Sequence, residues 1–132
     1  MKICRRFIEI KTKNAFEILE KKYNMVFPEE VKNFFEENNA GVPQKMYISI
    51  DGDDYEVRSF LSFNEDDEYD IYKPLDFFQT KTKGKIVPFA IDSGDNYYCY
   101  NKENGCVYFY ASSEDKYYKL SNKFTDFINL FV

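Results

Sequence analysis

Two carboxylates lie close together in the segment PFAIDSGDNYYCY, which covers residues 88–100. Asp92 and Asp95 flank Ser93-Gly94 and could exchange protons as a pair or hold a metal ion. Asp, Ser and Gly are also the residue types that tight turns select, for reasons of backbone geometry alone. We therefore predict a turn between two strands, with metal binding and contact with a partner as alternatives.

The available chemistry is restricted because the 132 residues include no histidine. This excludes Ser-His and Cys-His nucleophile pairs and metals bound through imidazole. Cys4, Cys99 and Cys106 have no CxxC spacing, so we predict free, packed thiols, with a Cys99–Cys106 bridge across a hairpin as the alternative. The spacings of calcium loops and P-loops are not matched either. We predict no catalytic residue, no metal site and no cofactor.

Acidic residues are concentrated in one part of the chain. Residues 51–76 hold ten carboxylates and two basic residues, a net charge of −8, whereas residues 1–13 carry +4 and the whole chain −5. This balance disfavours nucleic acid and favours a basic protein partner. A solvated acidic face is the alternative. The candidate partner-binding acids are Asp51, Asp53, Asp54, Glu65, Asp66, Asp67, Glu68, Asp92 and Asp95.

The order of elements predicts an α+β domain. Apolar residues at helical spacing predict helices over 15–24 and 28–41 and after 121, with Asn14 and Ser121 as caps, and a short helix is expected near 71–78. Alternating segments predict strands at 46–50 and 55–60, and segments bounded by turn residues predict further strands at 85–92, 96–101, 106–111 and 117–120. Strands that follow one another in this way form an antiparallel sheet, and we expect helices on one face of it.

Tyrosine is abundant in two of these strands. Because alternate residues of a strand share a face, Val107, Phe109 and Ala111 are expected to face the core. Tyrosine combines a large contact area with a polar tip, as interfaces require. Half-buried cross-strand pairs that stabilise the sheet are the alternative. The candidate anchors for a partner are Tyr98, Tyr100, Tyr108 and Tyr110.

The length of 132 residues fits one domain, with a basic segment 1–13 and a core 14–132. No apolar run approaches the roughly 20 residues that cross a bilayer. The N-terminal sequence MKICRRFIEI has no continuous apolar region of the signal-peptide type. We therefore expect a cytoplasmic protein that does not bind membranes.

Three stretches resemble the SUKH superfamily, which includes the fungal SMI/KNR cell-wall regulators and many bacterial immunity proteins. They are FPEEVKNFFEENNAG (27–41), VPFAIDSGDNYYCY (87–100) and GCVYFY (105–110). The resemblance extends from about residue 15 to the end of the chain. It implies a strongly bent antiparallel sheet, and it implies that Pro28, Gly41, Pro88, Ala90 and Gly94 determine the fold.

The resemblance also implies a function in binding. The expected protein is a non-catalytic immunity protein, a monomer or weak homodimer, that neutralises a cognate toxin, with a basic nuclease as the candidate toxin. One alternative is an intracellular interaction scaffold of the cell-wall-regulator type. A metal-dependent enzyme that uses the carboxylates is a further alternative.

Overall fold

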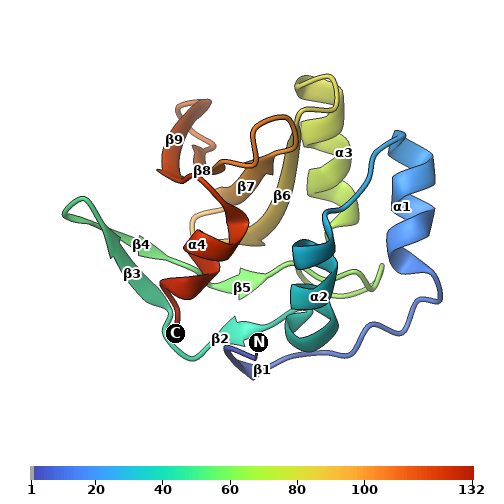
Figure 1. The fold of residues 1–132 in the computed structure, drawn as a ribbon, viewed down its shortest axis with the longest axis horizontal. Helices are drawn as coiled ribbons and strands as arrows, with labels where there is room; N and C mark the ends of the chain where they lie inside the picture. Colours follow the sequence, from blue (N-terminus) through green and yellow to red (C-terminus); the bar gives the residue numbers. More distant parts are fainter. Residues whose placement is uncertain (1) are drawn as a thin grey trace.

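The computed structural model describes residues 2–132, which form four helices and nine strands (Figure 1). Met1, the first residue of the predicted basic segment, lies outside the described residues. The helices are α1 (Ala15–Tyr23), α2 (Glu29–Asn38), α3 (Tyr72–Lys81) and α4 (Phe124–Asn129). The strands are β1 (Cys4–Arg6), β2 (Val42–Pro43), β3 (Tyr47–Ile50), β4 (Asp53–Glu56), β5 (Ser59–Phe60), β6 (Ile86–Ile91), β7 (Tyr97–Asn101), β8 (Val107–Ala111) and β9 (Lys116–Ser121).

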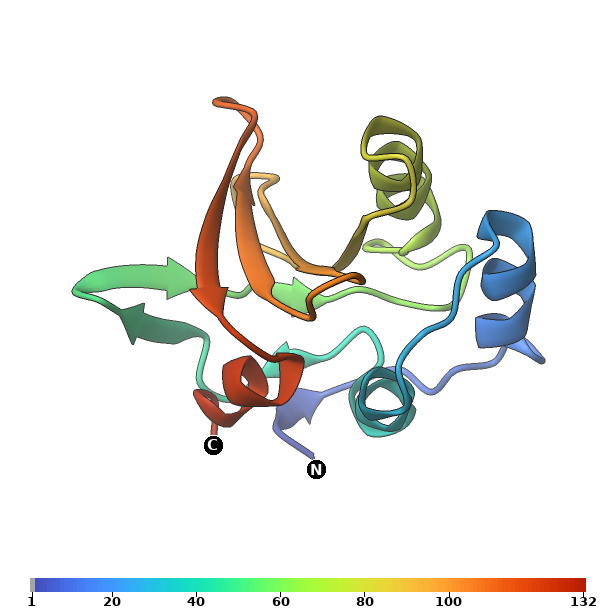
Figure 2. The same ribbon diagram turned by 45° about the horizontal axis from the view of Figure 1, so that its top comes forward.

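Five antiparallel strands form the main sheet in the order β5-β6-β7-β8-β9. Gly41, the residue before β2, lies alongside β5, where its carbonyl oxygen accepts a hydrogen bond from the Phe60 amide at 2.8 Å. The register shifts between Pro88 and Ala90 and between Val107 and Tyr108, and such bulges bend and twist a strand. Figure 2 shows β8 and β9 curving away from β5. The predicted α+β class and bent antiparallel sheet are confirmed.

Helices cover both faces of the main sheet. On one face, the ring of Phe127 in α4 lies 5.5 Å from that of Phe89 and 5.6 Å from that of Tyr98, measured between centroids. On the other face, Phe78 of α3 packs 5.1 Å from Tyr110. The expectation of helices on one side only is wrong, because the second face also carries apolar side chains that α3 removes from water.

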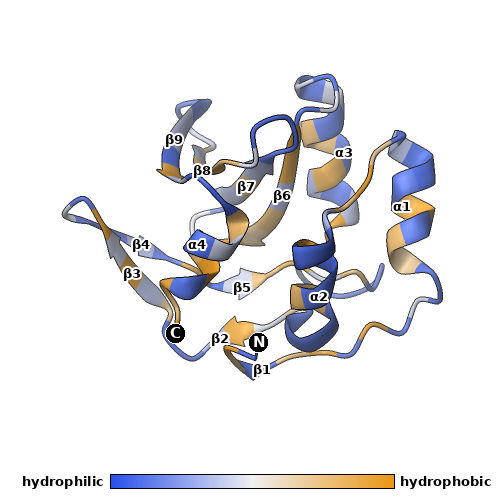
Figure 3. Cartoon of the chain, viewed as in Figure 1, coloured by the Kyte–Doolittle hydropathy of each residue, from blue (hydrophilic) through white to orange (hydrophobic). Residues whose placement is uncertain are grey.

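The helical stripes that the sequence predicts are buried. Val31, Phe34 and Phe35 of α2 point into the core, and all six residues of β6 are buried as well. Figure 3 shows hydrophobic colours along most of β6, beside the mixed surfaces of the helices. An apolar strand buried on both faces fits its position between β5 and β7 inside the sheet.

Of the two predicted helix caps, Asn14 is in place and Ser121 is not. Asn14 is the N-cap residue of α1, with a left-handed φ of 57°, but its side chain makes no capping hydrogen bond. The helix α4 begins after Lys123, whose carbonyl accepts a hydrogen bond from the Ser121 hydroxyl at 2.9 Å. Packing of buried residues such as Leu19 and Phe127 therefore holds these two helices in place.

Gly41 lies where the backbone and a cysteine approach closely. A Cβ atom at this position would lie 2.3 Å from Cys4 Sγ and 2.7 Å from the Asn38 carbonyl oxygen. Any larger residue would force these neighbours to move. This contact gives a physical reason for the structural role that the family resemblance implies for Gly41.

The predicted hairpin is present, but its turn is shorter than expected. Asp51 and Gly52 have φ angles of 52° and 86°, which suits a two-residue turn with both central residues in the left-handed region. Asp53 and Asp54, which we expected in the turn, are the first residues of β4. The expected strand 55–60 is divided between β4 and β5.

Two tyrosines of β7 give matched tests of the core. The buried Tyr98 hydroxyl donates to the Glu56 carbonyl at 2.6 Å, whereas the buried Tyr100 hydroxyl has no partner among the described residues. Tyr98→Phe is expected to lower the free energy of unfolding by about 1 kcal/mol, and Tyr100→Phe to leave it unchanged or raise it. Urea denaturation measures both. A larger loss in Tyr100→Phe than in Tyr98→Phe would contradict this assignment.

Candidate partner-binding site

The structure places two of the predicted tyrosine anchors inside the core. Tyr98 pairs with Phe109 and Tyr100 with Val107 across β7 and β8, so these four side chains share the sheet face that α4 covers. Tyr98 is 0% exposed and Tyr100 2% exposed. Neither ring is available to a partner, and their prediction as exposed anchors is wrong.

The other two predicted anchors lie on the opposite sheet face. Tyr110 is 4% exposed, and its hydroxyl donates to Asp115 at 2.7 Å. Asp115 also forms an ion pair with Lys81 of α3 at 2.9 Å. Burial, together with the hydrogen bond to Asp115, raises the pKa of Tyr110 to about 12. Tyr110 thus joins α3 to the β8–β9 turn, and only the half-buried Tyr108 remains partly accessible.

The predicted acidic residues fall into separate places. Asp51, Asp53 and Asp54 are exposed on the β3–β4 hairpin, whereas residues 65–68 belong to the loop between β5 and α3. Figures 1 and 2 show the hairpin and this loop on opposite sides of the main sheet's strand β5. In the loop, Asp67 accepts hydrogen bonds from Ser62, at 2.5 Å, and from the Asn64 side chain, at 3.2 Å. The two acidic groups therefore do not form one surface.

The predicted turn at residues 92–95 is confirmed. Asp92 accepts hydrogen bonds from the Gly94 amide at 2.9 Å and from the Asn96 amide at 2.8 Å. Ser93 donates from its amide and its hydroxyl to the Glu56 carboxylate, at 2.9 and 2.8 Å. Asp92 therefore stabilises the turn, and the turn is tied to β4. Asp95 is exposed beside it with a φ of 62°.

The arrangement of side chains does not favour a metal site or a cysteine nucleophile. Among residues 2–132, no three Asp, Glu or Cys side chains are grouped closely enough to hold a metal ion. Cys4 and Cys99 are buried free thiols, and burial raises the pKa of Cys4 to about 12 and that of Cys99 well above its ordinary value. Thiols with such pKa values are not ionised at neutral pH and do not act as nucleophiles.

The structure does bring acidic and aromatic groups together, with other aromatic residues than those predicted. Tyr55 of β4 packs edge-on against Phe109 of β8 at 5.4 Å between ring centroids. Phe109 lies directly opposite Tyr118 of the edge strand β9. The Tyr118 hydroxyl donates to Glu114 at 3.1 Å, and its ring is 41% exposed. The hairpin therefore continues the aromatic surface at the outer edge of the sheet.

Carboxylates border this row of rings. Asp53 shares a face of β4 with Tyr55, because residues two apart in a strand point the same way. The pKa of Tyr55 is raised by burial and then by the charges of Asp53 and Asp51. The hydrogen bond to Glu114 is the main cause that raises the pKa of Tyr118. We define the acidic–aromatic surface as Asp51, Asp53, Tyr55, Phe109, Glu114 and Tyr118.

Sequence reasoning missed four of these residues: Tyr55, Phe109, Glu114 and Tyr118. It placed Phe109 in the core, although Phe109 is only half-buried, with Tyr98 on one side and Tyr118 on the other. The alternation within β8 was the available signal, but the position of β8 near the edge of the sheet was not known. Asp54 points to the opposite face of the hairpin, where it accepts from the Ser49 hydroxyl at 2.6 Å.

A protein-family model matches residues 12–130, and this model describes the SMI1/KNR4 family (SUKH-1). The chain belongs to this family. Membership covers nearly the whole chain and supports, at the level of the family, a role of the immunity-protein type, in which the protein binds a partner. No curated protein matches the chain. None of the helices within residues 2–132 is both long and apolar enough to cross a bilayer.

The tyrosines predict a loss of stability in alkali. Nine of the twelve tyrosines have a raised pKa, with burial as the main cause for all but Tyr118. The unfolded chain, in which tyrosine has a pKa of about 10, then releases protons before the folded chain does. The stabilisation that these tyrosines contribute is therefore fully present below a pH of about 10. It is lost as the pH rises through their folded-state pKa values.

The urea midpoint, measured at several pH values, tests this expectation. For Tyr110 the window runs from the ordinary pKa of about 10 to the folded pKa of about 12. Tyr110→Phe removes that contribution, so its midpoint should fall less steeply over this window than that of the unmodified protein. Equal slopes for the two proteins would show that Tyr110 does not titrate as described.

Proposed function

We propose that this protein is an immunity protein that binds and neutralises a cognate protein toxin through the acidic–aromatic surface. The observation that supports the proposal is the row formed by Tyr55, Phe109 and Tyr118, with Asp51, Asp53 and Glu114 at its border. Aromatic rings with polar tips are favoured anchors in protein interfaces, and they bind most strongly when carboxylates or other polar groups surround them and exclude water.

The chemistry of the surface favours a basic toxin. A net charge of −5, with three carboxylates around the rings, attracts a basic protein and speeds its encounter. A nuclease is the toxin class that fits this best, because its active site must bind phosphates and is therefore basic. In the complex, Asp51 and Asp53 occupy the positions that substrate phosphates take in the toxin.

The proposed action needs neither catalysis nor a cofactor. The protein acts in the cytoplasm of the cell that makes it, as a monomer or weak homodimer, by occupying the toxin. Nucleic acid and membranes are not partners in this mechanism.

Co-expression tests the proposed function. The product of the gene immediately upstream is induced in a sensitive bacterial host, with and without this protein. Relief of toxicity by this chain is the expected result. A harmless neighbour, or toxicity without relief, would contradict the immunity role and favour the interaction scaffold.

Paired charge variants test the position of the surface. Asp51→Asn/Asp53→Asn removes two exposed carboxylates from the acidic–aromatic surface, and Glu65→Gln/Asp66→Asn removes two from the distant loop. The first variant should weaken toxin binding roughly three- to thirtyfold at low salt, the range expected for two partly exposed ion pairs. The second should change it less than about twofold. Isothermal titration calorimetry at two salt concentrations measures both effects. Equal losses of toxin affinity in the two variants would contradict the assignment of the binding surface.

A further inference from the structure

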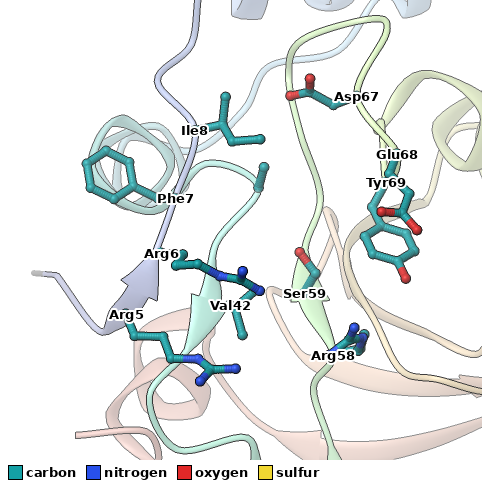
Figure 4. Close-up of a pocket in the computed structure, with 11 residues that line it drawn as sticks. Arg5, Arg6, Phe7, Ile8, Val42, Arg58, Ser59, Asp67, Glu68 and Tyr69 are labelled. Atoms are coloured by element: carbon teal, nitrogen blue, oxygen red, sulfur yellow. The ribbon is translucent and has the colours of Figure 1, made fainter.

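All three arginines of the chain line one cleft. Arg5, Arg6 and Arg58 are separated by up to 53 positions in the sequence, yet they surround the same cavity of about 540 Å³ (Figure 4). The remaining basic residues of the chain are fifteen lysines, none of which lines this cleft. We refer to this cavity as the arginine cleft. The grouping of all three arginines around one cavity in an acidic protein indicates a function in binding.

Irregular backbone brings the arginines together. Successive residues of a regular strand point to opposite faces, but the register of β1 against β2 shifts between Cys4 and Arg6. The bulge allows both Arg5 and Arg6 to line the cleft. Arg58 follows β4 and is fixed by the hydrogen bond from its amide to the Ile91 carbonyl at 2.9 Å. Bulges of this kind often re-aim a side chain near a binding site.

Within the described residues 2–132, the three guanidinium groups make no ion pair and no side-chain hydrogen bond. Among residues 2–132, no carboxylate forms an ion pair with Arg5, Arg6 or Arg58, although Asp67 and Glu68 line the same cleft. One carboxylate oxygen of Asp67 is already hydrogen-bonded to Ser62 and Asn64. Arginine is suited to bidentate binding of phosphate and carboxylate, so three unpaired guanidinium groups around one cavity suit an anion.

The cleft has two chemically different ends. Figure 4 shows Arg5, Arg6 and Arg58 in its lower part and Asp67 at the top. The carboxylate of Glu68 and the Tyr69 ring lie together on the right-hand side. Its volume of about 540 Å³ is within the roughly 300–1,000 Å³ of small-molecule sites. A ligand with negative charge at one end and hydrogen-bond donors at the other would match this lining.

We propose that the arginine cleft binds a small phosphate ester whose opposite end donates hydrogen bonds, with the dimensions of a nucleoside phosphate. Arg5, Arg6 and Arg58 bind the phosphate, and Glu68 accepts hydrogen bonds from the other end. Tyr69 offers a ring to the middle of the ligand. The proposal uses none of the residues of the acidic–aromatic surface, so it stands or fails independently of toxin binding.

Isothermal titration calorimetry in a buffer low in chloride tests the proposal, with inorganic phosphate and ADP as probes. ADP is expected to bind more tightly than inorganic phosphate. Arg5→Gln/Arg6→Gln and Arg58→Gln should each weaken both probes by at least about tenfold, because each removes charge-assisted hydrogen bonds. Arg5 and Arg6 are exposed, so their replacement should leave the urea midpoint unchanged.

Two further variants separate the ends of the cleft from general attraction of anions. Glu68→Gln should weaken ADP by about threefold while leaving inorganic phosphate unchanged or bound more tightly, since one hydrogen-bond acceptor and one repulsive charge are lost. The control variant Lys83→Gln/Lys102→Gln removes two positive charges, as Arg5→Gln/Arg6→Gln does, but from a different, lysine-lined cavity. It should leave ADP binding unchanged. No detectable ADP binding, equal affinity for ADP and inorganic phosphate, or an equal loss in the lysine variant would each overturn the proposal.

Discussion

The hydrogen-bonded register of β7, β8 and β9 decides which aromatic rings are core and which are surface. Tyr98, Phe109 and Tyr118 lie opposite one another across the three strands, with exposure rising from the interior to the edge. A shift of one residue in this register would turn every ring to the opposite face. The position of the acidic–aromatic surface therefore depends on the same contacts that form the core.

Glu56 connects the hairpin to that sheet at two levels. Its carbonyl oxygen accepts a hydrogen bond from the Tyr98 hydroxyl at 2.6 Å, inside the core. Its carboxylate accepts two hydrogen bonds from Ser93 in the neighbouring turn. Tyr55, one residue earlier, then rests on Phe109. These contacts hold the hairpin against the sheet before any partner arrives, which reduces the entropy cost of binding.

The sequence allowed the elements to be predicted better than the site. Periodicity identified α2, an apolar run that ends at a turn identified β6, and residue types identified the turn that Asp92 stabilises, because these features depend on neighbours in the chain. The exposure of Tyr98 and Tyr118 depends on strand order and sheet edges, which alternation within one strand does not contain. In the same way, the sequence places Arg58 far from Arg5, and only the packing of β1, β2 and β5 brings them to one cleft.

Amide hydrogen exchange of the protein with and without its toxin tests the central claim most directly, because it locates the contact without a substitution. The account predicts slower exchange on binding in the β3–β4 hairpin and in the β8–β9 segment. The loop at residues 64–70, which lies away from the hairpin on the other side of β5, should exchange at the same rate in both states. Protection of that loop, with the hairpin unchanged, would contradict the account.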